Sequence, residues 1–345
     1  MIPTHPALRF ATLLLPLALL AWLPSPAAAE SPVGSVADVK AYLVRTVEGM
    51  KEASADFVKA SAEYTALVQA NGGKLDAAHA AEGDKLAALV ARMQENYKKM
   101  DSYGYETVEG IVAGVESLGH YDIYLDAGVP ASEGPDDVAE VVLDLVNGEK
   151  IDRQGALFTY LIEPALWGGD ERWSVAVDGG TRLPRPEVLI ATAADADRKI
   201  GELLRDSEAW DATVEDLFGA MVLMTPTLSD YFEDWKESRY SEDKSGRFQA
   251  VSRISDMRGI MQSCAVMFKA VKAAVEGKDA ALAKSVDTGF DGILSFIDLL
   301  DEREKQGAIK EAEIDELASQ AKEKTDKLVP QIEQAAAVGG IKIAG

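Results

Sequence analysis

Apolar residues recur every three or four positions along most of this chain, which is the spacing of one face of an α-helix. The pattern is regular over residues 36–70 and ends at Asn71-Gly72-Gly73, because glycine readily adopts the left-handed conformation of a helix end. A second helix is expected over residues 76–100. Sustained alternation of apolar and polar residues, the mark of a β-strand, is absent. The chain is therefore predicted to be all-α.

A third helix is expected over residues 105–118, where Gly110 and Gly114 would let another helix approach closely. Residues 168–186 hold several glycines and prolines without a sustained period, so they are the best candidate for a boundary. We expect a bilobed fold of two antiparallel helical bundles, residues 30–185 and residues 186–345. The other helices are expected over residues 136–146, 152–167, 187–204, 210–223, 227–238, 248–275, 280–300 and 309–337.

The N-terminus has the pattern of a secretory signal peptide. Arg9 precedes a short apolar run over residues 10–23, and Pro26-Ala27-Ala28-Ala29 offers small residues for cleavage. The run is shorter than the roughly 20 residues that a membrane-spanning helix needs. We expect residues 1–29 to be removed near Ala29 and the mature protein to be periplasmic or secreted, without stable insertion in a membrane.

Charge and cysteine content limit the kinds of function that the chain can have. The chain has 35 basic and 58 acidic residues and a formal net charge of −23, which argues against binding nucleic acid or an anionic membrane surface. Cys264 is the only cysteine, so an intramolecular disulfide is impossible. Its apolar neighbours indicate a buried, inert thiol. Met257 and Met261 lie one turn apart, but core packing explains them more simply than a copper(I) site does.

Two groups of oxygen-bearing side chains stand in apolar surroundings. Glu106 and Glu109 share one face of a predicted helix, and Asp122 and Asp126 follow four residues apart. These acids are either solvated charges or ligands of a cation. Carboxylates among apolar residues are costly unless they are paired or bound to a cation, and few basic residues lie near them in the sequence. A hard metal ion would satisfy them.

Tyr160 and Glu163 form the second group, three residues apart in an almost wholly apolar predicted helix. The alternative is a core tyrosine and a glutamate that bonds a helix end. If this helix faces the first group, the two oxygens would complete an oxygen-rich site, and a phenolate oxygen suits ferric iron.

These residues resemble the imelysin-like family, which includes EfeO-type periplasmic iron-uptake components and is classed among peptidases. Its Glu-x-x-Glu and following Asp correspond to Glu106, Glu109 and Asp122, and the glutamate of its His-x-x-Glu signature, before Leu-Trp-Gly, corresponds to Glu163. Tyr160 stands where the family has the histidine. The resemblance implies a bilobed helical protein with a metal site in one lobe, made of Glu106, Glu109, Asp122, Glu163 and here Tyr160.

The expected function is to bind a metal ion, iron as Fe³⁺ or Fe²⁺ first, and to pass it to a membrane iron permease or another periplasmic uptake component. Copper, zinc and calcium are the alternative metals. An imelysin-type metallopeptidase is the alternative function, although the chain has no His-Glu-x-x-His and only His79 and His120 follow the signal. A peptide- or polysaccharide-binding module without metal is a further alternative. Residues 230–236 and 252–256 have distinctive sequences with no role assigned.

Overall fold

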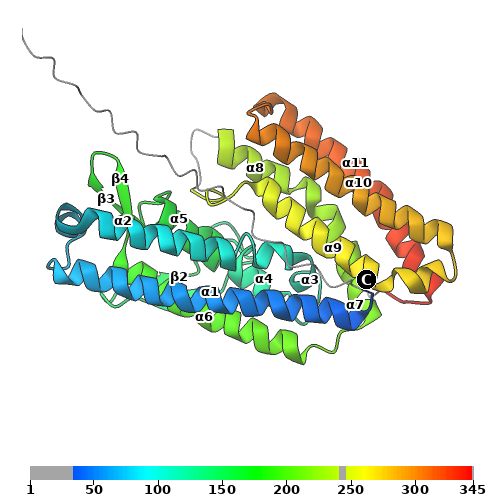
Figure 1. Cartoon of the computed structure of the whole chain (residues 1–345), viewed down its shortest axis with the longest axis horizontal. Helices are drawn as coiled ribbons and strands as arrows, with labels where there is room; N and C mark the ends of the chain where they lie inside the picture. Colours follow the sequence, from blue (N-terminus) through cyan, green and yellow to red (C-terminus); the bar gives the residue numbers. More distant parts are fainter. Residues whose placement is uncertain (1–33, 241–245, 344–345) are drawn as a thin grey trace, which may run out of the picture. The chain divides into compact units, whose positions relative to one another are not determined.

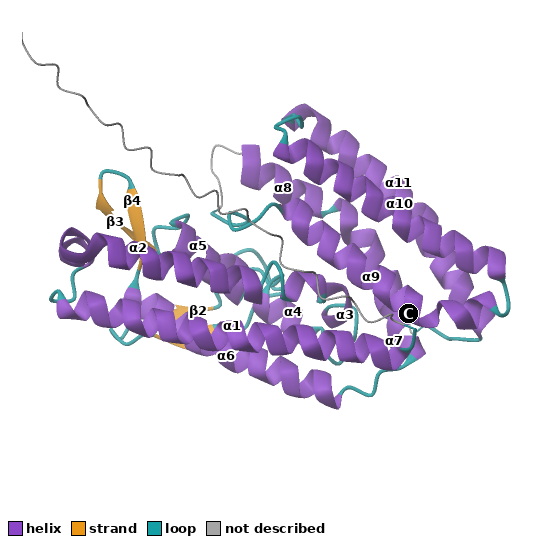
Figure 2. Ribbon diagram, viewed as in Figure 1, coloured by secondary structure: helices purple, strands orange, loops and turns teal. Residues whose placement is uncertain are grey.

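The computed structural model describes residues 34–240 and 246–343, and it confirms the all-α prediction for them. The signal peptide expected at residues 1–29 lies outside the described residues. Helices dominate, and two small antiparallel hairpins interrupt them (Figures 1 and 2). The helices are α1 (Val36–Ala70), α2 (Leu75–Met100), α3 (Glu109–Val112), α4 (His120–Leu125), α5 (Glu163–Trp167), α6 (Pro186–Ala209), α7 (Val214–Met224), α8 (Tyr231–Tyr240), α9 (Arg253–Glu276), α10 (Ala280–Lys305) and α11 (Ile314–Gly339).

The long helices form where the periodic pattern predicts them. In α1 the apolar positions Val39, Leu43 and Val47 are fully buried, as the spacing of three and four requires. The Ser35 hydroxyl caps the helix by accepting the backbone N–H of Asp38. The buried face of α1 packs against α2 on one side and α6 on the other (Figure 1).

The second set of packed helices is formed by α9, α10 and α11, with α9 against α10 and α10 against α11. Helix α9 also contacts α3 and α7, so it connects this set to the segment that carries the first acids. The described residues, 34–240 and 246–343, belong to one compact unit. The division into residues 30–185 and 186–345 stays a prediction.

Two hairpins form where the sequence pattern predicts no strands. The helix expected over residues 136–146 is wrong, because residues 142–144 form strand β1 (Val142–Asp144) and pair with β2 (Lys150–Asp152). Leu143 and Ile151 face each other in this hairpin and are both buried, while their neighbours in each strand are exposed. The boundary segment contains the second hairpin, β3 (Ser174–Asp178) and β4 (Thr181–Pro184).

The helices expected over residues 105–118 and 152–167 are broken into short turns. A 3-10 turn (Tyr105–Thr107) precedes α3, and a π-helical turn (Leu157–Ile162) precedes α5. A Cβ on Gly110 would lie 2.2 Å from Ser263 Oγ in α9, and one on Gly114 would lie 2.5 Å from Ala220 Cβ in α7. These glycines therefore permit the close approach of helices that the sequence predicts.

None of the helices within residues 34–240 and 246–343 combines the length and apolar character needed to cross a membrane.

Candidate functional site

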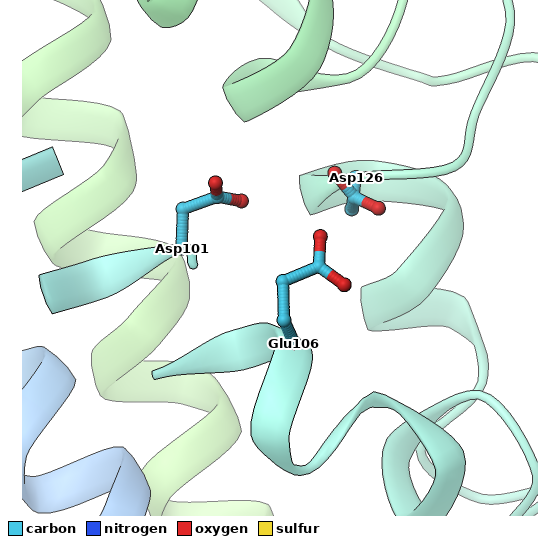
Figure 3. Close-up of side chains that lie close together, drawn as sticks. All are labelled: Asp101, Glu106 and Asp126. Carbon is cyan, nitrogen blue, oxygen red and sulfur yellow. The ribbon is translucent and has the colours of Figure 1, made fainter. Parts of the chain in front are cut away.

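Three buried carboxylates converge from three segments at the centre of the candidate site (Figure 3). Asp101 follows the end of α2, Glu106 lies in the 3-10 turn, and Asp126 follows the end of α4. Each offers an oxygen within 4.8 Å of the others, and the three residues are 6%, 1% and 5% exposed. We call Asp101, Glu106 and Asp126 the carboxylate triad. Within the described ranges, no other three His, Cys, Asp or Glu side chains meet this closely.

The triad surrounds a small cavity of about 10 Å³, which is room for about one water molecule or one ion. Glu163 and Asp256 add two further carboxylates to its wall. Oδ1 of Asp101 and Oε2 of Glu106 are buried without a hydrogen-bond partner. Buried polar atoms are nearly always satisfied, so these two oxygens are available to a cation. We call this space the inner cavity; its walls are Tyr97, Asp101, Ser102, Glu106, Asp126, Thr159, Glu163, Phe248, Val251 and Asp256.

Hydroxyl groups hold two members of the triad, Asp101 and Asp126, in place. The Ser102 hydroxyl donates to Asp101 Oδ2 at 3.1 Å. The Thr159 hydroxyl, from the π-helical turn, lies within hydrogen-bond distance of the carboxylate and the backbone carbonyl of Asp126. These hydrogen bonds occupy one carboxylate oxygen of Asp101 and one of Asp126. The other oxygen of each carboxylate can therefore bind a ligand.

Glu109 and Asp122, both predicted as ligands, stand beside the triad and are held by tyrosines. The Tyr231 hydroxyl donates to Glu109 Oε1 at 2.7 Å, and the Tyr105 hydroxyl donates to Asp122 Oδ1 at 2.7 Å. Oε2 of Glu109 is buried without a partner. Neither residue lines the inner cavity. Asp126, which the resemblance passes over in favour of Asp122, is the residue that does.

Glu163 lines the inner cavity, but its oxygens already accept backbone hydrogen bonds. The N–H groups of Phe248, Gln249 and Ala250 donate to its carboxylate at 2.6, 2.7 and 2.7 Å. The side chain thus fixes the segment before α9 across the cavity. The sequence-based alternative is a glutamate that bonds a helix end, whereas Glu163 bonds backbone groups of the segment that precedes α9.

Tyr160 faces a different space, a pocket of about 230 Å³ that we call the outer pocket. Its hydroxyl accepts a hydrogen bond from Arg247 at 2.8 Å, and the guanidinium carbon lies 4.6 Å from the ring centroid. Tyr160 does not line the inner cavity. The outer pocket is lined by Asp126, Ala127, Thr159, Tyr160, Thr227, Asp230, Tyr231, Asp234, Arg247, Phe248 and Arg253.

Arg253 supplies a buried positive charge to the site. Its Nη1 lies 3.2 Å from Asp256 and 3.5 Å from Glu106, and its Nη2 lies 3.7 Å from Asp234. The guanidinium carbon lies over the rings of Tyr231 and Phe248, at 4.3 Å from each centroid. One arginine therefore compensates several carboxylates.

Burial and mutual repulsion raise the pKa values of these acids. Loss of hydration holds the pKa of Asp101, Glu106 and Asp122 well above the usual range, and neighbouring carboxylates raise it further. Burial also raises the pKa of Glu163 to about 7, against the opposing effect of its three backbone hydrogen bonds. A group of acids that resists ionisation in this way would be stabilised by a bound cation.

Sequence reasoning missed Asp101 and Arg253. Arg253 lies in the distinctive segment 252–256, and Tyr231 lies in segment 230–236, so both unassigned segments reach the site. Their unusual composition was the only signal. Asp101 carries none, because it directly follows a regular helix and is one acid among many.

The remaining reactive groups do not join the site. Cys264 is fully buried in α9, as expected, and burial raises its pKa to about 12. Met257 and Met261 are fully buried in the core, which agrees with the packing interpretation. His120 stacks on the ring of Tyr121 at 4.1 Å between centroids.

The sequence matches no protein-family model, and no curated protein matches it significantly. The imelysin-like assignment therefore rests on the quoted motifs alone.

Proposed function

We propose that this protein binds one hard metal cation through the carboxylate triad of Asp101, Glu106 and Asp126. The observation that carries the proposal is a set of three buried carboxylates within 4.8 Å of one another, two of which have a buried oxygen without a partner. Packing alone does not account for this, since burying an uncompensated carboxylate costs several kcal/mol.

The donor set indicates the class of cation. Every donor of the triad is a carboxylate oxygen, which is the ligand of Ca²⁺, Mg²⁺, Mn²⁺ and iron rather than of Cu⁺. The resemblance to imelysin-like proteins favours iron among these. In this proposal the protein acts outside the cytoplasm, holds iron in transit, and releases it to a membrane permease or another uptake component.

Calorimetric titration of the metal-stripped protein tests the proposal, with Fe²⁺, Fe³⁺, Cu²⁺, Zn²⁺ and Ca²⁺ as ligands. Asp101→Asn and Glu106→Gln should each weaken binding by at least about tenfold, or about 1.4 kcal/mol. Asp195→Asn is the matched control, because Asp195 is a buried acid of α6 that bonds Tyr124 and Arg198 and lines neither cavity. Affinity weaker than about 1 mM for every metal, roughly −4 kcal/mol, would refute the proposal.

A further inference from the structure

The inner cavity and the outer pocket meet at three residues. Asp126, Thr159 and Phe248 line both spaces, and all three are buried. The outer pocket reaches solvent, since Ala127 and Asp230 on its wall are exposed. A cation that leaves solvent through the outer pocket therefore reaches a wall that contains Asp126, one of its proposed ligands.

A second hollow of about 400 Å³, beside Tyr103, also approaches the inner cavity, but it shares only Val251 with it. The isopropyl side chain of Val251 has no oxygen that could replace the water ligands of an entering cation. The outer pocket offers the Asp126 carboxylate and the Thr159 hydroxyl at the same step. Since hard cations exchange one oxygen ligand for another, the outer pocket is the favoured path.

Charge in the outer pocket also favours a passing cation. Asp230 and Asp234 add negative charge to its wall. Two arginines, Arg247 and Arg253, also line this pocket, so with Asp126 its wall carries three carboxylates against two guanidinium groups. The Arg253 side chain is 6% exposed and is paired with Glu106, Asp256 and Asp234. The outer acids do not form a second close group of three ligands in the described parts of the chain. They attract a cation without holding it.

We propose that the outer pocket is the access route of the cation, with the Phe248 ring as the barrier and Asp126 as the residue that transfers the ion to the triad. This inference rests on the proposed cation site. Phe248 fits the role of barrier because this residue lines both spaces, while its backbone N–H is held by Glu163.

Stopped-flow luminescence of Tb³⁺, a hard oxygen-seeking cation, tests the route by separating the association and dissociation rates. Ala127→Trp places a large ring at the exposed edge of the outer pocket. It should slow association and dissociation by the same factor, at least about tenfold, and leave Kd unchanged. Phe248→Leu should speed both rates. A mutation that only disturbed the fold would change Kd instead.

The charge of the pocket is tested by Asp230→Asn, with the exposed Asp211→Asn as its control. Asp211 lies in a different acidic hollow, beside Trp210. Asp230→Asn should slow association a few-fold at low ionic strength, by roughly threefold, and the difference should shrink in high salt. The control should keep the wild-type rate.

The outcomes separate the two proposals. Failure of the wild-type protein to bind Tb³⁺ would overturn both the site and the route. Binding with wild-type rates in Ala127→Trp and Phe248→Leu would overturn the route alone. Slower exchange in Val251→Phe, with no effect of Ala127→Trp, would also overturn it by assigning the path to the other hollow.

Discussion

The free energy of unfolding of the metal-free protein should fall as the pH rises from about 5 to about 8. The reason is the raised pKa of the buried carboxyl groups, which keep their protons in the folded state after the unfolded chain has lost them. Between the unfolded and the folded pKa, the folded state binds more protons, so deprotonation favours unfolding. This is the reverse of the usual behaviour of salt-bridged acids.

The raised pKa of Glu163 gives the size of the expected fall in the free energy of unfolding. Its folded pKa is about 7 against an ordinary value of 4.5, so it alone removes about 3 kcal/mol of stability between pH 4.5 and pH 7, at 1.36 kcal/mol for each pH unit. The pKa of Asp256 is raised to about 7 by burial, in the same direction. The fall should therefore be at least about 3 kcal/mol, which is a large part of a typical domain's stability.

Urea unfolding of the chelator-treated protein at several pH values measures this directly. Glu106→Gln should flatten the curve and stabilise the metal-free protein at about pH 8 by about 1–3 kcal/mol, since it removes one carboxylate from a mutually repelling group. Asp195→Asn separates this effect from the general repulsion of an acidic chain. In that control, the unfolding free energy should change with pH as it does in the wild type.

A metal-free stability that stays level or rises over this pH range would refute the reasoning, because the acids would then be compensated within the protein. If the unfolding free energy of Glu106→Gln fell with pH as steeply as that of the wild type, the reasoning would be refuted for the triad. Added metal should reverse the trend in the wild type, since a cation binds the ionised carboxylates and stabilises by RT ln(1 + [L]/Kd).

Three further predictions concern single side chains. Arg253→Met should destabilise the metal-free protein at neutral pH by about 3–5 kcal/mol in urea unfolding, because it leaves buried carboxylates unpaired. Gly110→Ala should cost about 1–3 kcal/mol of stability, because the new methyl group would lie 2.2 Å from Ser263 Oγ, whereas Gly219→Ala has nothing within 4 Å. Tyr160→Phe should leave metal affinity in calorimetry unchanged, because the hydroxyl lies in the outer pocket.

For each of these three predictions, one result would contradict the reasoning. A stable Arg253→Met protein would mean that Arg253 does not compensate the carboxylates of the site. Equal stabilities of Gly110→Ala and Gly219→Ala would contradict the close approach of α3 and α9. A large loss of affinity in Tyr160→Phe would restore the phenolate ligand that the sequence predicts.

The periodic pattern predicted the regular parts of the fold. Helices α1, α10 and α11 lie where it places them, because each keeps one buried face over many turns. It failed over residues 136–146, where the structure has the short strand β1. Three residues are too few to show alternation, and Asn147-Gly148 ends a helix or turns a hairpin equally well.

The site was predictable only in part. The apolar setting of Glu106 identified it as unusual, and the structure places it in the triad. Asp101 and Asp126 follow helix ends, where acids are common and periodicity gives no information. Which helix ends meet depends on the packing of α9 against the first helices, and that is a property of the whole chain.

Anomalous diffraction from crystals of the metal-stripped protein soaked in iron tests the central claim most directly. The account predicts one strong peak inside the inner cavity, within coordination distance of Asp101, Glu106 and Asp126, and its loss in Glu106→Gln. A peak elsewhere, such as the acidic hollow that contains Asp211, or no peak at a concentration that saturates binding in solution, would contradict it.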